Sequence, residues 1–125
     1  MNKQDIFNFT YTDANDIDKL NEALLAYPQL IYEAEMELSD RIKDLKEASA
    51  RLATVEASKL LSSTNKTVQE KKASVILLTQ EEVEKEINCQ IAELKAKAEY
   101  NKFKHGFDAL KKVANNVEAR INSKL

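Results

Sequence analysis

The sequence contains few residues that interrupt regular structure. Among 125 residues it has one glycine and one proline, and it has no tryptophan. Because glycine and proline mark turns, their scarcity predicts few turns and long helices. Aromatic residues make up only 6% of the chain and charged residues 32%, so a large globular core is not expected. We expect helices that bury narrow apolar stripes against one another or against another copy of the chain.

Residues for catalysis and metal binding are equally scarce. His105 is the only histidine and Cys89 the only cysteine, which excludes an intrachain disulfide and leaves a histidine-based relay or zinc site without partners. A glycine-rich phosphate loop is also absent. Carboxylates lie three or four residues from lysines, as in EVEKE, and ion pairs on a helix surface explain this spacing without acid–base catalysis. We therefore expect no enzymatic activity, no metal and no cofactor.

The chain has no long apolar run. None approaches the roughly 20 residues that span a bilayer, and the first ten residues, MNKQDIFNFT, lack the apolar core of a signal peptide. Together with the lone cysteine, these features predict a cytoplasmic protein without membrane contact.

Charge is distributed unevenly. Residues 1–57 carry 6 basic and 12 acidic residues, a net charge of −6, whereas residues 58–125 carry 13 basic and 9 acidic residues, a net charge of +4. Two explanations are open: the halves pair with each other, within or between chains, or the basic half contacts a polyanion.

The first 27 residues form a separate N-terminal segment. Phe7, Phe9 and Tyr11 alternate with polar residues, which is the period of a strand. A single strand is not stable alone, so we expect residues 1–12 to form an extended arm whose aromatic rings pack on a helix or on a neighbouring subunit. A short helix is predicted over residues 13–27, capped by Thr12 or Asp13. Pro28 either ends this helix or opens the next, because proline is tolerated in the first turn of a helix.

Residues 28–125 are predicted to form a helical hairpin. Its first arm, residues 28–61, has apolar residues on a seven-residue rhythm, the spacing of a coiled-coil seam. Residues 62–66 form the turn. Thr67 and Glu70 have the spacing of a capping box, so a helix starts there; Thr79 and Glu82 repeat it, and we expect a bend with helix on both sides. The predicted fold is all-α: one domain containing a long antiparallel, coiled-coil-like hairpin with a short N-terminal helix and an extended arm.

The last predicted helix carries two apolar stripes. The first contains Val83, Ile87, Ile91, Leu94 and Ala98; the second contains Phe103, Phe107, Leu110, Ala114, Val117 and Ile121. The stripes are offset by more than a quarter turn, so a simple two-helix hairpin cannot bury both. Either the helix bends near Gly106, or the second stripe packs on the N-terminal helix, the aromatic arm or a second chain. We predict a homo-oligomer whose interface contains Phe103, Phe107, Leu110, Val117 and Ile121.

Two groups of lysines are candidates for contact with nucleic acid. Lys59, Lys66, Lys71 and Lys72 surround the predicted turn, and Lys102 and Lys104 lie on the last helix. Lysines on a projecting turn can contact phosphates. The alternative for both groups is a solvated helix face opposite the acidic first arm. The aromatic residues near Lys102 have a spacing that favours packing over base stacking.

Three segments, LNEALLAYPQLIYEAEMEL, NKTVQEKKASV and AEYNKFKHGFDALKKVANNVEARI, occur in an order that resembles the small phage recombination mediators. Proteins of that family bind single-stranded DNA and help to load a recombinase onto it. In them a Lys-Thr segment opens the second arm and an alanine-rich, aromatic-containing helix closes the chain; here Lys66 and Thr67, and residues 98–121, occupy those places. The resemblance is one of pattern and spans about residues 28–125.

The resemblance implies a DNA-recombination or replication accessory protein of the host-cell cytoplasm. Lys66, Lys71 and Lys72 would contact DNA phosphates, and a recombinase or single-strand-binding protein would be the partner. Two rivals remain. One is a protein-interaction module, such as a phage assembly factor or an inhibitor of a host defence complex, whose acidic face mimics nucleic acid through Glu33, Glu37, Asp40, Asp44 and Glu47. The other is a purely structural coiled-coil spacer.

Overall fold

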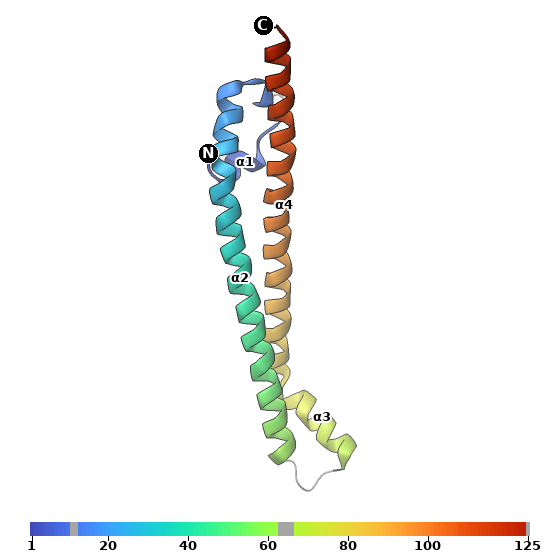
Figure 1. Cartoon of the computed structure of the whole chain (residues 1–125). Helices are drawn as coiled ribbons and strands as arrows, with labels where there is room; N and C mark the ends of the chain where they lie inside the picture. Colours follow the sequence, from blue (N-terminus) through green and yellow to red (C-terminus); the bar gives the residue numbers. More distant parts are fainter. Residues whose placement is uncertain (11–12, 63–66, 125) are drawn as a thin grey trace. The chain divides into compact units, whose positions relative to one another are not determined.

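The computed structural model describes residues 1–10, 13–62 and 67–124. Within these ranges the chain is helical and contains no strand. Its elements are α1 (Lys3–Phe7), the short 3-10 helix η1 (Asp13–Asn15), α2 (Ile17–Ser62), α3 (Val68–Leu78) and α4 (Gln80–Lys124) (Figure 1). The two long helices, α2 and α4, pack against each other as a hairpin, which confirms the predicted fold class. The predicted turn, residues 62–66, falls mostly outside the described residues.

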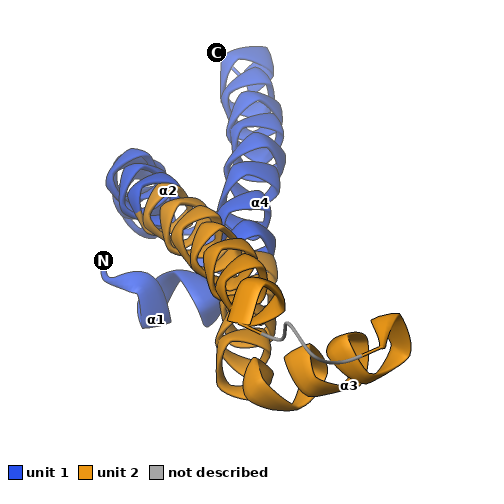
Figure 2. Ribbon diagram, turned by 90° about the horizontal axis from the view of Figure 1, so that it is seen from below, with its two compact units in different colours: residues 1–36, 97–125 blue, residues 37–96 orange. Residues whose placement is uncertain are grey.

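The chain divides into two compact units (Figure 2). Unit 1 comprises Met1–Met36 and Lys97–Leu125, and unit 2 comprises Glu37–Ala96. Each unit contains part of α2 and part of α4; α1 and η1 belong to unit 1 and α3 to unit 2. The division predicted after residue 27 does not coincide with the end of an element, because α2 runs through that position.

The N-terminal arm is helical where an extended conformation was expected. The prediction is wrong for Lys3–Phe7 because Asn2 and Asp5 form a reciprocal cap. Each backbone N–H donates to the other residue's side-chain oxygen, at 2.9 Å in both directions. This cap satisfies two backbone donors at the helix start. The expected docking of the arm's aromatic residues is confirmed for Phe7, whose ring stacks on Phe103 with centroids 5.5 Å apart.

Helix α2 begins later and runs further than expected. Its cap is Asp16, whose Oδ1 accepts from the backbone N–H groups of Asp18 at 3.0 Å and Lys19 at 3.3 Å. Pro28 lies inside α2, so the prediction that it ends one helix or opens the next is wrong. Proline removes one backbone hydrogen bond, but Tyr27 and Leu30 on either side are buried. Their packing offsets that loss.

The main core lies in unit 1. Tyr27 lies edge-on to Phe103, with centroids 6.5 Å apart, and stacks on Phe107 at 5.5 Å. The second predicted stripe of α4 therefore packs on the N-terminal part of α2 and on the arm, which is one of the alternatives considered above. The buried members of this core are Ile6, Ala14, Leu20, Ala23, Tyr27, Leu30, Ala34, Phe103 and Leu110.

Unit 2 buries smaller side chains. Its buried apolar residues are Ala48, Val75 and Ala96. Thr79, which is also buried, joins α3 to α4. Its hydroxyl donates to the Val75 carbonyl at 2.6 Å, and its backbone N–H donates to the same carbonyl at 3.0 Å. The predicted break at Thr79 with helix on both sides is confirmed, and α3 leaves α4 at an angle there (Figure 1).

Helix α4 continues through Gly106 without a break. Its inward face has a seven-residue repeat of buried and half-buried residues: Cys89, Ala96, Phe103, Leu110 and Val117. The second stripe therefore continues toward the start of the helix through smaller side chains. The first predicted stripe is not the packed face, because Ile87, Ile91 and Leu94 are exposed.

Candidate nucleic-acid interface

The start of α3 presents two of the predicted DNA-contacting lysines. The Oγ1 of Thr67 accepts from the backbone N–H of Glu70 at 3.2 Å, as its capping spacing predicts. This cap starts the helix at Val68 and places Lys71 and Lys72 in its first turns. Lys72 is exposed and Lys71 half-buried. Within the described ranges neither ammonium forms an ion pair, whereas Lys66 lies outside those ranges.

Lys59 has a different environment. It lies in the last turn of α2, where a positive charge interacts favourably with the helix dipole. It is half-buried and already has an interaction within the chain. Lys59 is therefore less available to a phosphate than Lys72.

The lysines predicted on the last helix belong to unit 1 and lie over aromatic rings. The Nζ of Lys102 is 4.2 Å from the centroid of Phe7, and the Nζ of Lys104 is 5.4 Å from that of Tyr100. A cation over a ring face is attracted by the ring quadrupole. The structure thus distributes the described candidates over two units, with Lys59, Lys71 and Lys72 in unit 2 and Lys102 and Lys104 in unit 1.

The five predicted oligomer-interface residues occupy three environments. Phe103 and Leu110 are core residues of the single chain, at 2% and 7% exposure, and Phe107 and Val117 are half-buried. Only Ile121 is exposed, at 43%. Phe103 and Leu110 offer no free surface to a second copy, and the oligomer itself stays a prediction.

The acidic face of α2 is partly neutralised within the helix. Arg41 forms ion pairs with Glu37, Nε to Oε1 at 3.5 Å, and with Asp44, Nη1 to Oδ2 at 3.4 Å. Glu33 accepts a hydrogen bond from Gln29 at 3.1 Å. Pairs of this kind at three- and four-residue spacing are ordinary features of helix surfaces. They weaken the interpretation of this face as a nucleic-acid mimic.

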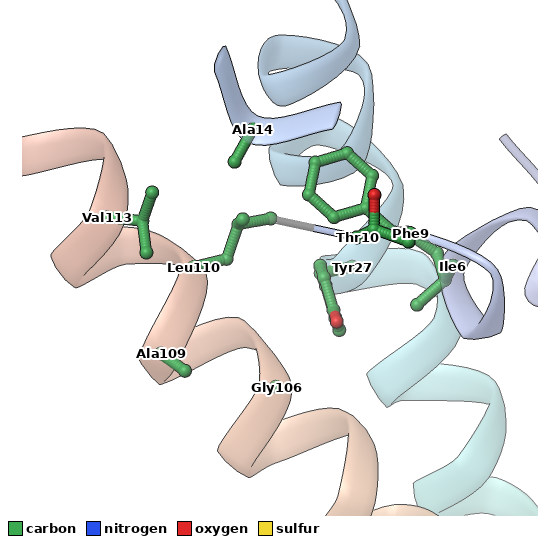
Figure 3. Close-up of a pocket in the computed structure, with 9 residues that line it drawn as sticks. All are labelled: Ile6, Phe9, Thr10, Ala14, Tyr27, Gly106, Ala109, Leu110 and Val113. Carbon is green, nitrogen blue, oxygen red and sulfur yellow. The ribbon is translucent and has the colours of Figure 1, made fainter. Parts of the chain in front are cut away.

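A cavity of about 300 Å³ lies in unit 1 between the arm, α2 and α4 (Figure 3). Among the described residues that line it, Thr10 and Tyr27 carry side-chain hydroxyls, and burial raises the pKa of the Tyr27 phenol above its ordinary 10.0. None of these described lining residues carries a charged group that could bind a phosphate or a metal. The residues that line it are Ile6, Phe9, Thr10, Ala14, Tyr27, Gly106, Ala109, Leu110 and Val113.

Sequence reasoning missed how the arm closes over this cavity. Two signals in the sequence indicate it: the capping-box spacing of Asn2 and Asp5, and the seven-residue spacing that links Phe103 to Leu110. The first predicts a helix in the arm, and the second predicts which face of α4 is packed.

The remaining reactive side chains form no site. Cys89 is half-buried and His105 is exposed. Across residues 1–10, 13–62 and 67–124, no group of three or more potential metal ligands comes together. Within the same ranges, no helix combines the length and apolar character needed to cross a membrane. No protein-family model, curated protein or solved structure matches the chain.

Proposed function

We propose that this protein is a non-enzymatic accessory protein of DNA recombination or replication, which binds single-stranded DNA and bridges it to a recombinase or a single-strand-binding protein. The observation that carries this proposal is the placement of Lys71 and Lys72 in the first turns of α3, without ion pairs to other described residues. The pattern resemblance to phage recombination mediators points to the same lysines.

The chemistry at the start of α3 suits the DNA backbone. Lysine ammonium groups contact phosphates and release condensed counterions, so binding weakens as salt rises. The N-terminus of α3 adds the positive end of a helix dipole. Phe103 and Tyr27 are buried and cannot stack on bases. We therefore expect binding through phosphates with little preference for base sequence.

The lysines on α4 have another role in this proposal. Lys102 and Lys104 lie over Phe7 and Tyr100, so they stabilise the packing of unit 1. Contact with DNA is assigned to Lys66, Lys71 and Lys72. The two lysine groups can therefore be tested separately, because either group can be substituted while the other is left unchanged.

Fluorescence anisotropy of a labelled single-stranded oligonucleotide tests the proposal at several salt concentrations. The test variant changes Lys66, Lys71 and Lys72 to Ala; a charge-matched control changes Lys97, Lys112 and Lys124, three exposed lysines of α4, to Ala. Removing three phosphate contacts should lower the slope of log affinity against log salt by about 2. The control should keep most of that slope.

Two results would contradict the proposal. One is an absence of binding by the wild-type protein at low salt, which would direct attention to protein partners. The other is an equal loss of affinity in both triple variants, which would show that the total charge matters and the start of α3 does not.

A further inference from the structure

The cavity in unit 1 contains a hydroxyl that no other described residue binds. Tyr27 lines this cavity, is 9% exposed, and has its ring against Phe103 and Phe107. Its phenol forms no hydrogen bond to another residue of the described ranges. Gly106, beside that hydroxyl, has no side chain that could cover it. A buried tyrosine hydroxyl usually has a hydrogen-bond partner, so this one is available to a bound molecule.

The second hydroxyl at the cavity is already in use. The Thr10 hydroxyl donates to the Oδ2 of Asp13 at 3.1 Å and accepts from the Asp13 backbone N–H at 3.3 Å. A well-ordered buried water makes about three hydrogen bonds, and the described lining residues offer one free side-chain group. Water is therefore poorly bonded in this cavity, and an apolar molecule that displaces it gains affinity.

The volume and lining of the cavity fit a small apolar molecule. About 300 Å³ is at the lower end of the range of small-molecule sites, which are mostly apolar with a few polar groups. The arm contributes Phe9 to the walls, α2 contributes Tyr27 and α4 contributes Leu110 (Figure 3). None of the described lining residues is charged. A carboxylate or an ammonium group would stay unpaired there, and burying an unpaired charge is costly.

We propose that this cavity binds an uncharged molecule with a ring-sized apolar body and a hydrogen-bond acceptor, such as an aromatic ketone. The Tyr27 hydroxyl donates to the acceptor, and the apolar walls enclose the body. Burial raises the pKa of the phenol, so the hydroxyl keeps its proton and remains a donor at neutral pH. This inference goes beyond the proposed DNA binding and does not rest on it, because Lys71 and Lys72 belong to unit 2.

Two ligands of the same size separate the hydroxyl from the apolar walls. Acetophenone has a ring and a carbonyl acceptor, and ethylbenzene has the same carbon skeleton without the acceptor. Each is titrated into the full-length protein while the methyl signals of Ile6, Leu110 and Val113 are followed by nuclear magnetic resonance. We expect saturable shifts of these signals with both ligands. Tyr27→Phe should weaken the binding of acetophenone roughly fivefold, the value of one neutral hydrogen bond, and should not weaken the binding of ethylbenzene.

A second pair of variants locates the bound ligand. Ala109→Leu places a larger side chain at the cavity wall and should lower the affinity for both ligands by roughly tenfold or more. The matched control is Ala98→Leu, on the same helix but away from the cavity lining, and should change neither affinity. Both alanines are exposed, so we expect both variants to fold, and the methyl spectrum of each variant without ligand checks this.

Three results would overturn the inference. The first is an absence of saturable shifts with either ligand up to its solubility limit. The second is an equal change in affinity for the two ligands in Tyr27→Phe, which would show that the hydroxyl does not bind the acceptor. The third is an equal effect of Ala109→Leu and Ala98→Leu, which would place the bound ligand outside this cavity.

Discussion

Tyr27 on α2 and Gly106 on α4 approach so closely that no side chain fits between them. A Cβ atom placed on Gly106 would lie 2.6 Å from the hydroxyl oxygen of Tyr27 and 3.3 Å from two of its ring carbons. Both residues line the cavity beneath the arm (Figure 3). The ring cannot withdraw easily, because it stacks on Phe107 and meets Phe103 edge-on. The only glycine of the chain thus leaves room for the Tyr27 hydroxyl against α4.

Gly106→Ala should lower the free energy of unfolding. Alanine improves helix propensity by about 0.5–1 kcal/mol, but overpacking a held ring costs about 1–3 kcal/mol. The cost of overpacking exceeds the gain in helix propensity, so we expect the free energy of unfolding, measured in urea, to fall by about 1 kcal/mol. Adding Tyr27→Phe removes the closest atom and should restore part of the loss. If both variants lose the same amount, the hydroxyl contact is not the cause.

Phe103→Ala should be among the most destabilising single substitutions. Its side chain is enclosed by the rings of Phe7 and Tyr27, and truncating a buried phenylalanine costs about 3–5 kcal/mol. Ile121→Ala, on the same helix but exposed, serves as the control and should change stability little. Thermal unfolding followed by circular dichroism measures both. Equal effects would indicate that Phe103 is not enclosed by its own chain.

Lys102 and Phe7 should show a measurable coupling. The ammonium lies over the ring face, and an exposed cation–π contact contributes about 0.5–1 kcal/mol. A double-mutant cycle with Lys102→Met and Phe7→Leu isolates this energy in urea unfolding. Lys102→Met should leave affinity for single-stranded DNA almost unchanged. A strong loss of affinity would instead assign Lys102 to DNA contact.

Acid should loosen the arm through Asp13. The backbone N–H of Thr10, and then its hydroxyl, donate to the Asp13 carboxylate and hold its pKa below the ordinary 3.8, with a smaller contribution from Lys19. The folded carboxyl therefore binds a proton less tightly than the unfolded one. Its stabilising contribution is present above pH 3.8 and is lost as pH falls through the lowered pKa.

Thermal unfolding at a series of acidic pH values measures this effect. Asp13→Asn should flatten the pH dependence below 3.8 relative to the wild-type protein. Parallel curves for the two proteins would show that Asp13 does not contribute to acid sensitivity.

The features that were predicted most accurately depend on residues that are close together in the sequence. The cap formed by Thr67 and Glu70 and the break at Thr79 need only a hydroxyl and a backbone group three or four residues away. The sequence of the arm carried two opposing local signals. The alternation of Phe7 and Phe9 suggested a strand, but the cap between Asn2 and Asp5 prevailed.

Features that depend on packing were harder to predict. Pro28 stays in α2 because Tyr27 and Leu30 are buried beside it, and this requires knowledge of what covers them. The first apolar stripe named in the sequence does not mark the packed face of α4 in unit 2, because the inward residues there are small. Ile87 and Ile91 gave a stronger hydrophobic pattern than Cys89 and Ala96, although the latter face inward. Packing does not determine which residues contact DNA, so the proposed DNA-contacting residues stay a prediction.

The unequal cores of units 1 and 2 have a consequence for how the backbone opens. Amide hydrogens exchange with solvent through local unfolding, and regions with few buried apolar contacts open at the lowest free energy. Helix α4 passes from unit 2, where it buries Ala96, into unit 1, where it buries Phe103 and Leu110. One continuous helix should therefore have slow exchange around Phe103 and faster exchange before Ala96.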